Sequence, residues 1–303
     1  MSATLEQIQA QVAERMAEIG PVWASDIRRH HQIVVEAYTP LVAAAPKGGI
    51  KVMRDLAYGA HPRQRLDVFQ PENTGRAPVV IFVHGGAFVR GEKSLNGEIY
   101  DNILYFFARH AIVGVNTEFR LAPESVFPGG AEDVRLAVEW ARRNALNYGG
   151  DPERLFLIGH SAGGSHVATY AFDPNVDAKP GPEVAGLIII SGRVRADIRP
   201  DNPNADAVKT YFGDDPSLYE IRSPVNYADQ CRLPTLIAVA EYENPYLDVY
   251  GAELHYRMSV ARKRSPRFIQ VARHNHTSIV AHLNTADESF GLELLDFIAQ
   301  ADR

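Results

Sequence analysis

Apolar residues near the N-terminus recur at three- and four-residue steps, at Leu5, Ile8, Val12, Met16 and Ile19. Because an α-helix has 3.6 residues per turn, this spacing places them on one face of a helix. Gly20-Pro21 breaks the pattern, and a second helix is predicted from about residue 24 to residue 42. We expect residues 1–45 to pack on a larger domain, either as a pair of helices with a structural role alone or as a cap over a substrate pocket.

Short, continuous apolar runs replace the helical spacing after a linker that contains Pro and Gly at residues 45–49. Such runs are typical of strands that are buried on both faces of a sheet. Strands are predicted at 51–58, 65–71, 79–83, 112–116, 155–159, 186–191, 235–240 and 267–271. Helices are predicted at 98–110, 131–147, 162–171, 249–262 and 286–300. This alternation predicts an α/β fold with a mostly parallel sheet and helices on both of its faces.

Residues 192–233 interrupt the alternation, because they are polar, rich in Pro and Asp, and helical only in short pieces. We predict that they form an insertion above the strand ends. The expected organisation is therefore an N-terminal helical cap segment at residues 1–45 and an α/β domain at residues 46–303. That domain carries the cap insertion at about residues 192–233.

Composition excludes several classes of protein. The 303 residues are 46% apolar and 22% charged and have a net charge of −6, which is ordinary for a soluble globular protein. The basic run at residues 262–264 is short, so we expect no nucleic-acid partner. The chain has no run of 18 apolar residues, and its N-terminus lacks the basic start and apolar core of a signal peptide. We therefore expect no membrane association.

A single cysteine bears on the compartment. Cys231 can form no intramolecular disulfide, which is compatible with the cytoplasmic location that we expect. The apolar N-terminal stripe is also compatible with a homodimer.

One serine stands between two glycines in the stretch Gly159-His160-Ser161-Ala162-Gly163. The stretch follows a predicted buried strand and precedes a predicted helix of small residues. In this context the serine occupies a tight, strained turn that pushes its hydroxyl out above the sheet. We predict that Ser161 is a nucleophile. The alternative is a glycine-rich corner that is structural or binds phosphate.

The sequence VHGGAFVRG at residues 83–91 forms a second glycine-rich loop directly after a predicted strand. Such a loop brings backbone N–H groups close to a reacting oxygen, where they stabilise the oxyanion formed during acyl transfer. The predicted donors of this oxyanion hole are Gly86, Ala87 and Ala162. Gly85 is a substitute for one of them, and His84 is expected to fix the loop rather than to act as a base.

Three sequence blocks resemble those of a known family. The stretches HGGAF, FRLAPESVFPGGAEDV (119–134) and GHSAGG are similar, in order and spacing, to the blocks of the hormone-sensitive-lipase-like esterase group of α/β-hydrolases. The resemblance covers about residues 50–300. It implies an α/β-hydrolase fold with an eight-stranded sheet, a cap made from the N-terminal helices and the insertion, and hydrolysis of carboxylic esters without a cofactor. It also implies scaffold roles for Arg120, Glu124 and Asp133.

A serine nucleophile needs an imidazole to accept its proton, and in this fold the base should follow the last strand. The stretch RHNHTSIV there resembles the ending of several esterases and aryl formamidases, in which the second histidine is catalytic. We therefore assign the base to His276, with His274 as the competitor, and expect His160 to be structural. We expect no metal site at a pair of these histidines, because no third ligand with suitable spacing is evident. The other histidine after this strand is His282.

The acid that orients the imidazole should follow the strand predicted at 235–240. The stretch AEYENPYLD at residues 240–248 departs from the Asp-Pro-Leu that is usual in the hormone-sensitive-lipase-like group. Instead, EYENP resembles the Glu-x-Asp-x-Pro of formamidase-like and feruloyl-esterase-like relatives. We assign the acid to Glu243, which stands in the place of that aspartate, and keep Asp248 and Glu241 as alternatives.

These assignments predict a serine hydrolase that cleaves small-molecule carboxylic esters with small to medium acyl or aryl groups through an acyl-enzyme. An aryl-formamidase-type amidase is the alternative within enzymes. An inactive hydrolase-fold protein that binds a ligand is the alternative from another class. Aromatic residues near the expected site loops are predicted to contact the substrate, namely Phe88, Tyr170, Tyr211 and Tyr246.

Overall fold

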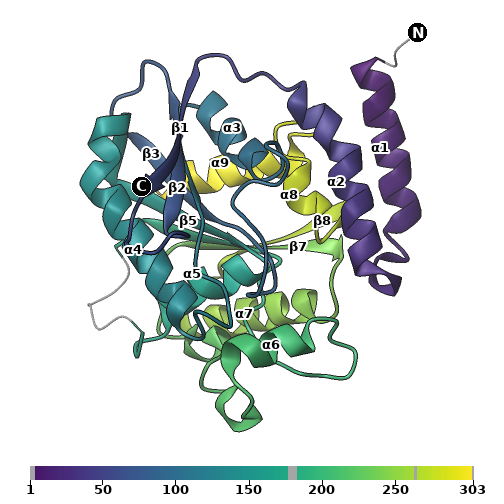
Figure 1. Cartoon of the computed structure of the whole chain (residues 1–303), viewed down its shortest axis with the longest axis vertical. Coiled ribbons are helices and arrows are strands. Elements are labelled where there is room, and N and C mark those ends of the chain that lie inside the picture. Colours follow the sequence, from purple (N-terminus) through teal and green to yellow (C-terminus); the bar gives the residue numbers. More distant parts are fainter. Residues whose placement is uncertain (1–3, 177–182, 263–264, 302–303) are drawn as a thin grey trace.

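A single twisted sheet organises the chain (Figure 1). The computed structural model describes residues 4–176, 183–262 and 265–301, and in these ranges eight strands pair in the order β1-β2-β4-β3-β5-β6-β7-β8. The strands are β1 (Ile50–Ala57), β2 (Arg65–Pro71), β3 (Ala77–Val83), β4 (Val113–Thr117), β5 (Gly150–His160), β6 (Gly186–Ile190), β7 (Thr235–Tyr242) and β8 (Arg267–Asn275). The β1–β2 and β2–β4 ladders are antiparallel and the others are parallel. The predicted mostly parallel sheet of eight strands is confirmed.

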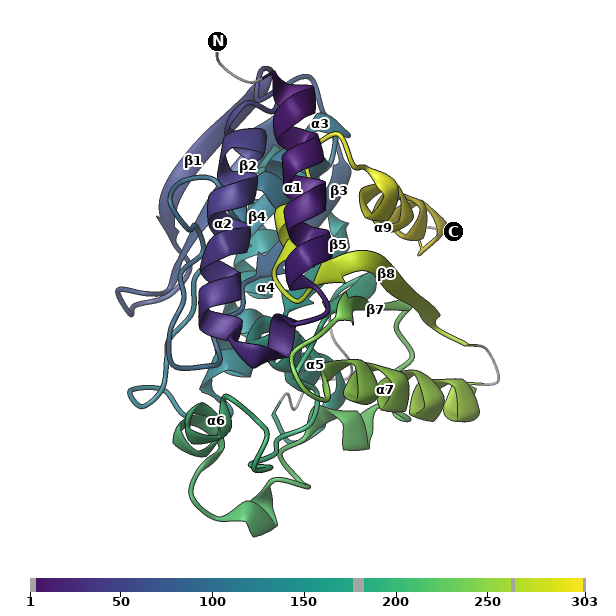
Figure 2. The ribbon, with the colours of Figure 1, turned by 90° about the vertical axis from the view of Figure 1, so that its right-hand side faces the viewer.

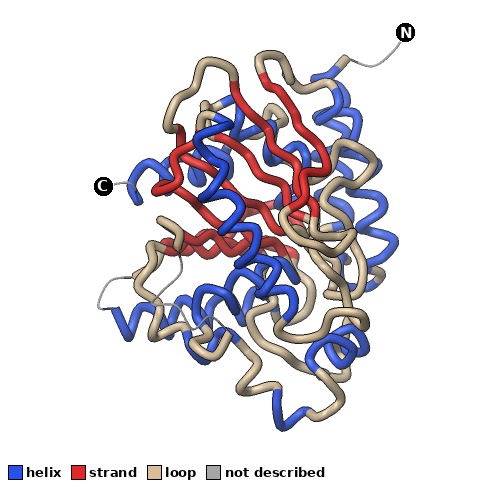
Figure 3. The backbone as a smooth tube through the Cα atoms, turned by 60° about the vertical axis from the view of Figure 1, so that its left-hand side comes forward, coloured by secondary structure: helices blue, strands red, loops and turns tan. Residues whose placement is uncertain are grey.

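Helices cover both faces of the sheet (Figures 2 and 3). One face carries α1 (Leu5–Ile19), α2 (Ile27–Ala43), α3 (Asp101–Arg109), α8 (Ser278–Ala281) and α9 (Ser289–Ala301). The other carries α4 (Gly129–Asn144), α5 (Ala162–Phe172) and α7 (Leu247–Arg262). Alternate residues of a strand point to opposite faces, so Val80 and Phe82 of β3 belong to the first core and Val79 and Ile81 to the second.

Several elements extend beyond the apolar runs that predicted them. The β7–β8 ladder continues to Tyr242 opposite Asn275, beyond the apolar runs of both strands, because backbone pairing with a neighbouring strand needs no apolar pattern. The short helix α8 has no periodic signal in the sequence.

In the described ranges, no helix combines the length and the apolar character that a membrane span requires. Residues 1–3 of the predicted N-terminal segment and residues 263–264 of the basic run lie outside those ranges.

The N-terminal helices pack on the sheet through the predicted apolar stripe. Val12, Met16 and Ile19 of α1 are buried and belong to the core shared with α2 and β8. A capping box starts α1, since the Thr4 hydroxyl accepts from the Gln7 N–H and the Gln7 side chain accepts from the Thr4 N–H. Most of the stripe is thus used within the chain, whereas Leu5 at its start is 53% exposed. The homodimer stays a prediction.

The segment between β6 and β7 leaves the sheet at the carboxyl end of β6. It contains α6 (Ala205–Phe212) and two short 3₁₀ helices. Val208 and Phe212 of α6 pack with Phe88 and Ala162 in a separate apolar cluster. The segment therefore lies against the loop after β3 and against the start of α5.

Candidate active site

Ser161 lies at the sharp turn between β5 and α5. Its backbone has φ 56° and ψ −117°, a conformation that costs a residue other than glycine about 1–3 kcal/mol. Glycines close the turn, since a Cβ atom on Gly159 would lie 2.5 Å from the Gly163 carbonyl oxygen. A Cβ atom on Gly163 would lie 2.1 Å from the Val83 carbonyl oxygen. The turn therefore has the strain and the close backbone approach expected of a strand–Gly-x-Ser-x-Gly–helix motif.

The structure brings together the three residues predicted to form a triad. His276 Nε2 lies 3.0 Å from Ser161 Oγ, and His276 Nδ1 lies 2.7 Å from Glu243 Oε2. Ser161 follows β5, Glu243 follows β7 and His276 follows β8. Because these strands are parallel, their carboxyl ends lie at one edge of the sheet, and residues far apart in the sequence meet there.

Hydrogen bonds hold both oxygens of the Glu243 carboxylate. Oε1 accepts from the Ser191 hydroxyl and, at 2.8 Å, from the Ala240 N–H. Oε2 accepts from His276 and, at 3.2 Å, from the Asn244 N–H. The Glu243 side chain is only 3% exposed, so its orientation is fixed. The sequence did not show the contribution of Ser191, because a serine at the end of a strand has no local pattern that reveals its partner.

The two alternative carboxylates lie elsewhere. Asp248 is exposed in the first turn of α7, where a negative charge interacts favourably with the helix dipole. Glu241 is exposed and accepts a hydrogen bond from the Arg273 N–H at 2.6 Å. Among the described residues, neither carboxylate is hydrogen-bonded to His276.

The loop after β3 is folded tightly against the nucleophile. Three successive residues have positive φ, namely Gly86 (141°), Ala87 (49°) and Phe88 (70°). A Cβ atom at position 86 would lie 1.9 Å from the Arg90 carbonyl oxygen, so the turn requires glycine there. A Cβ atom on Gly85 would lie 3.0 Å from Ser161 Cβ, which shows how closely the loop approaches the serine.

The predicted oxyanion donors have unused N–H groups. Within the described part of the chain, the N–H groups of Gly86 and Ala87 donate no hydrogen bond. Ala162 is the first residue of α5, and the first N–H groups of a helix have no acceptor within it. These three groups adjoin Ser161 and are therefore candidates for binding an oxyanion.

Two buried histidines support the site. His84 Nε2 lies 2.8 Å from Glu118 Oε1, and its Nδ1 lies 2.6 Å from the Gly85 carbonyl oxygen, so both ring nitrogens tie down the loop. His160 Nε2 lies 2.9 Å from the His276 carbonyl oxygen, which accepts its proton in a hydrogen bond. Burial and the nearby His276 lower the pKa of His160 well below 6.5. The His160 ring is therefore neutral at physiological pH and adds no charge beside the imidazole of His276.

Most of the rings predicted to contact a substrate are covered by protein. Phe88 and Tyr211 stack with centroids 4.7 Å apart at an angle of 6°. Phe88, Tyr211 and Tyr170 are 1%, 2% and 4% exposed, so the structure gives these three rings packing roles and does not support substrate contact. Tyr246 is partly exposed, and its hydroxyl donates to Asp201 at 2.8 Å. Of the four predicted rings, only Tyr246 remains a candidate for substrate contact.

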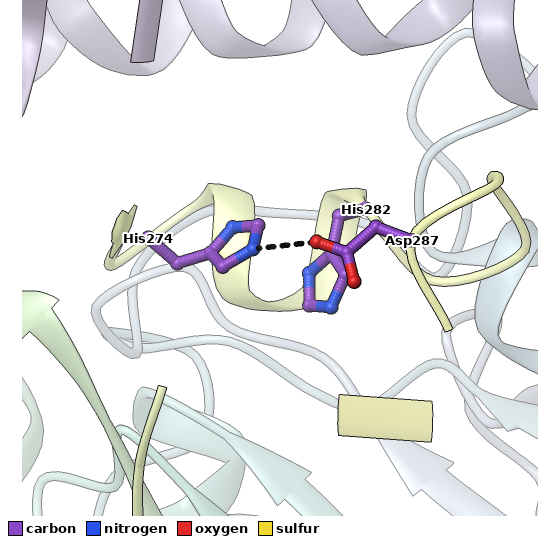
Figure 4. A group of neighbouring side chains, drawn as sticks. All are labelled: His274, His282 and Asp287. Carbon is purple, nitrogen blue, oxygen red and sulfur yellow. Dashed lines mark ion pairs between the residues drawn. The ribbon is translucent and has the colours of Figure 1, made fainter. Parts of the chain in front are cut away.

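Two histidines and an aspartate, from the end of β8 and the chain between α8 and α9, lie close together (Figure 4). His274, His282 and Asp287 place potential ligand atoms within 4.8 Å of one another, so a third group that the sequence did not show is present. The two imidazoles stack with centroids 4.0 Å apart at an angle of 28°. Asp287 pairs with His274 Nε2 at 3.5 Å, and the absence of a metal stays a prediction.

The burial of two other histidines predicts that the folded state loses stability at acid pH. Burial lowers the pKa of His166 and of His282 from 6.5 to about 3. Below pH 6.5 the unfolded chain therefore binds a proton at each histidine that the folded chain does not bind. The free energy of unfolding should fall by about 1.4 kcal/mol per pH unit for each histidine, down to about pH 3. Urea denaturation at pH 7 and pH 5 measures this loss.

A histidine substitution separates this effect from other titrating groups. His282→Asn keeps an amide donor for the Ser278 carbonyl oxygen, which His282 Nδ1 contacts at 2.7 Å, but removes the titrating ring. The dependence of stability on pH should become shallower in this variant. His255→Asn, on the half-buried His255 of α7, is the control and should keep the original slope. An unchanged slope in His282→Asn would contradict the assignment.

Comparisons with known proteins show what the chain is similar to. The family described as BD-FAE matches residues 66–180. Esterase LipC of Mycobacterium tuberculosis is 29% identical over 262 residues, which are 80% of this chain and 60% of LipC. A probable isoprenylcysteine alpha-carbonyl methylesterase of Oryza sativa subsp. japonica is 36% identical over 119 residues, which are 39% of this chain and 27% of that protein. The chain thus spans less than two thirds of the length of these relatives.

Solved structures match nearly the whole chain. A bacterial heroin esterase superposes with a TM-score of 0.73 at 22% identity, over 96% of this chain and 98% of that one. The chain has the α/β-hydrolase fold. A hyperthermophilic esterase from the archaeon Pyrobaculum calidifontis also matches this α/β-hydrolase fold, with a TM-score of 0.68 at 21% identity over 92% of each chain. The fold class and the resemblance to the esterase group of α/β-hydrolases, both predicted from the sequence, are confirmed.

Proposed function

We propose that the protein is a serine hydrolase that cleaves carboxylic esters of small to medium acyl or aryl groups. The observation that carries this proposal is the unbroken chain of hydrogen bonds from Ser161 through His276 to Glu243, at 3.0 and 2.7 Å. It lies at a strained turn beside a loop with unused N–H groups. The esterase names of the relatives point to the same reaction class.

The geometry suits acyl transfer in two steps. Ser161 Oγ attacks the ester carbonyl carbon while His276 Nε2 takes the hydroxyl proton. The resulting oxyanion accepts hydrogen bonds from the N–H groups of Gly86, Ala87 and Ala162. His276 then protonates the leaving alcohol, the C–O bond breaks and an acyl-enzyme forms. Water attacks this acyl group with His276 as base, and the acid product leaves with Ser161 regenerated.

Glu243 orients the base in this mechanism. Its Oε2 accepts the Nδ1–H of His276, which leaves Nε2 free to take the proton of the serine. When His276 becomes an imidazolium, the adjacent carboxylate stabilises the new positive charge. No cofactor is needed for these steps.

We also propose that the N-terminal helices and the insertion form a cap over this site. His31 of α2 lies 3.0 Å from the Thr277 hydroxyl, next to the base. The Arg90 side chain, in the oxyanion loop, donates to Asn204 of the insertion at 3.1 Å. The two segments therefore border the site from different sides. The size of the acyl group that fits depends on both of them.

We infer a cytoplasmic location and no nucleic-acid partner. Cys231 is buried and unpaired, which suits a reducing compartment. The net charge of −6 disfavours binding to a polyanion.

A panel of substrates tests the proposed reaction. We expect hydrolysis of p-nitrophenyl esters, with kcat/KM highest for short or medium chains in a series from acetate to laurate. N-formylkynurenine should be a poorer substrate, and a higher kcat/KM for it would establish the amidase alternative. A fluorophosphonate probe should label the protein. A protein that neither hydrolyses any of these compounds nor reacts with the probe would instead be an inactive ligand-binding hydrolase fold.

A further inference from the structure

We propose that Trp23 and His31, in the N-terminal helical segment (residues 4–43), are positioning residues that hold the acid and the base of the triad in place. The proposal rests on the proposed function. It gives this segment a role distinct from covering a substrate, since the segment also fixes the geometry of proton transfer. The two contacts join residues 221 and 246 positions apart in the sequence.

The N-terminal segment holds the chain on both sides of the base. Directly before His276, Asn275 directs its Nδ2 to Met16 Sδ at 3.5 Å. Directly after His276, the Thr277 hydroxyl lies 3.0 Å from His31 Nδ1. Because both neighbours of the base are bonded to α1 or α2, a displacement of these helices would move the imidazole relative to the nucleophile.

The N-terminal segment also contacts the chain on both sides of the acid, Glu243. Trp23 Nε1–H donates to Asn244 Oδ1 at 2.9 Å, and these two side chains are only 2% and 5% exposed. The N–H of Asn244 in turn donates to Glu243. On the other side of Glu243, the ring of Tyr242 lies so close to Gly20 that a Cβ atom on this glycine would lie 2.4 Å from it.

These contacts form one connected unit. The Trp23 carbonyl oxygen lies 2.9 Å from His30 Nδ1, which ties the tryptophan to the start of α2. The acid and base loops are joined directly, since the His276 N–H donates to the Tyr242 carbonyl oxygen at 3.0 Å. Trp23 is buried and touches no reacting atom, so it acts only through other residues. Because a misplacement of about 1 Å can lower a rate by about a hundredfold, such indirect support affects turnover.

Two substitutions remove the contacts. Trp23→Phe deletes the N–H donor but keeps an aromatic ring, and His31→Leu deletes the partner of Thr277. We expect each to lower kcat for p-nitrophenyl butyrate by about tenfold or more and to leave KM within about twofold, as loss of transition-state geometry requires. The rate of inactivation by a small fluorophosphonate should fall in parallel, because this probe reports the reactivity of Ser161 without a large bound substrate.

Matched variants separate positioning from general destabilisation. His31→Asn places an amide near the position of Nδ1 and should restore kcat to within about threefold of wild type. Trp140→Phe alters the other tryptophan, on α4, and His255→Leu alters a half-buried histidine on α7. Both control variants should keep full activity. Circular dichroism and thermal melting verify that each variant is folded, and the two His31 variants decide the outcome if Trp23→Phe does not fold.

The possible outcomes are distinct. A raised KM with unchanged kcat and unchanged inactivation rate would overturn the proposal and make the two residues part of a substrate cap. Equal losses in the controls, or no rescue by His31→Asn, would also overturn it. If wild-type protein neither hydrolyses esters nor reacts with the probe, the proposed function itself fails, which no variant result can imitate.

Discussion

Ser161→Ala should abolish ester hydrolysis while the fold is kept. The substitution removes the hydroxyl oxygen that His276 Nε2 contacts at 3.0 Å, and alanine fits the same tight turn between Gly159 and Gly163. We expect kcat for a p-nitrophenyl ester to fall by about a thousandfold or more, as serine hydrolases do when they lose one triad member. Labelling by a fluorophosphonate should disappear.

A neighbouring serine provides the control. Ser165 lies one turn further along α5, is 1% exposed, and its hydroxyl has no hydrogen-bond partner among the described residues. Ser165→Ala should therefore retain both activity and labelling. A folded Ser161→Ala protein with more than about a thousandth of the wild-type kcat would refute the nucleophile assignment.

Glu243→Gln should lower kcat by about a hundredfold or more. The Oε1 position receives the Ala240 N–H and the Ser191 hydroxyl, so the oxygen of a glutamine amide is favoured there. Its NH₂ group would then face His276 Nδ1 and favour the tautomer with the proton on Nε2. An Nε2–H cannot accept the proton of Ser161, and the uncharged amide does not stabilise an imidazolium.

The competing acid is tested on the same ester. Asp248→Asn should leave kcat nearly unchanged, because Asp248 is exposed at the start of α7 and makes no described contact with His276. A small loss of stability is expected from the weaker interaction with the helix dipole. A crippled Asp248→Asn enzyme together with an active Glu243→Gln enzyme would reverse the assignment.

Much of the fold was predictable because its signals are local. The continuous apolar runs of the buried strands and the spacing in α1 depend only on neighbouring residues, and both correspond to elements of the structure. Element ends were less predictable. The edge strand β8 runs on to Asn275 through polar residues, and hydrogen bonding to β7 extends a strand there without any apolar pattern.

The same distinction between local signals and long-range contacts applies to the candidate site. Ser161, Glu243 and His276 could be nominated because each follows a recognisable strand in a fixed order. Ser191 and Trp23 could not, because each meets its partner only after distant segments have packed, and neither stands in a local motif. The rings of Phe88 and Tyr211 illustrate the opposite error, since nearness to the site loops in sequence did not reveal that they stack on each other.

The strand order also places the parts of the site in regions of the sheet that differ in local stability. Ser161 and the oxyanion loop follow β5 and β3 in the middle of the sheet, whereas Glu243 and His276 follow β7 and β8, and β8 is its last strand. Edge elements open locally at a lower free energy than central ones. On heating, local unfolding of β7 and β8 would separate the acid and base from the nucleophile while the rest of the molecule remains native. We therefore expect the half-life of activity on heating to follow local opening of β7 and β8 rather than melting of the whole domain.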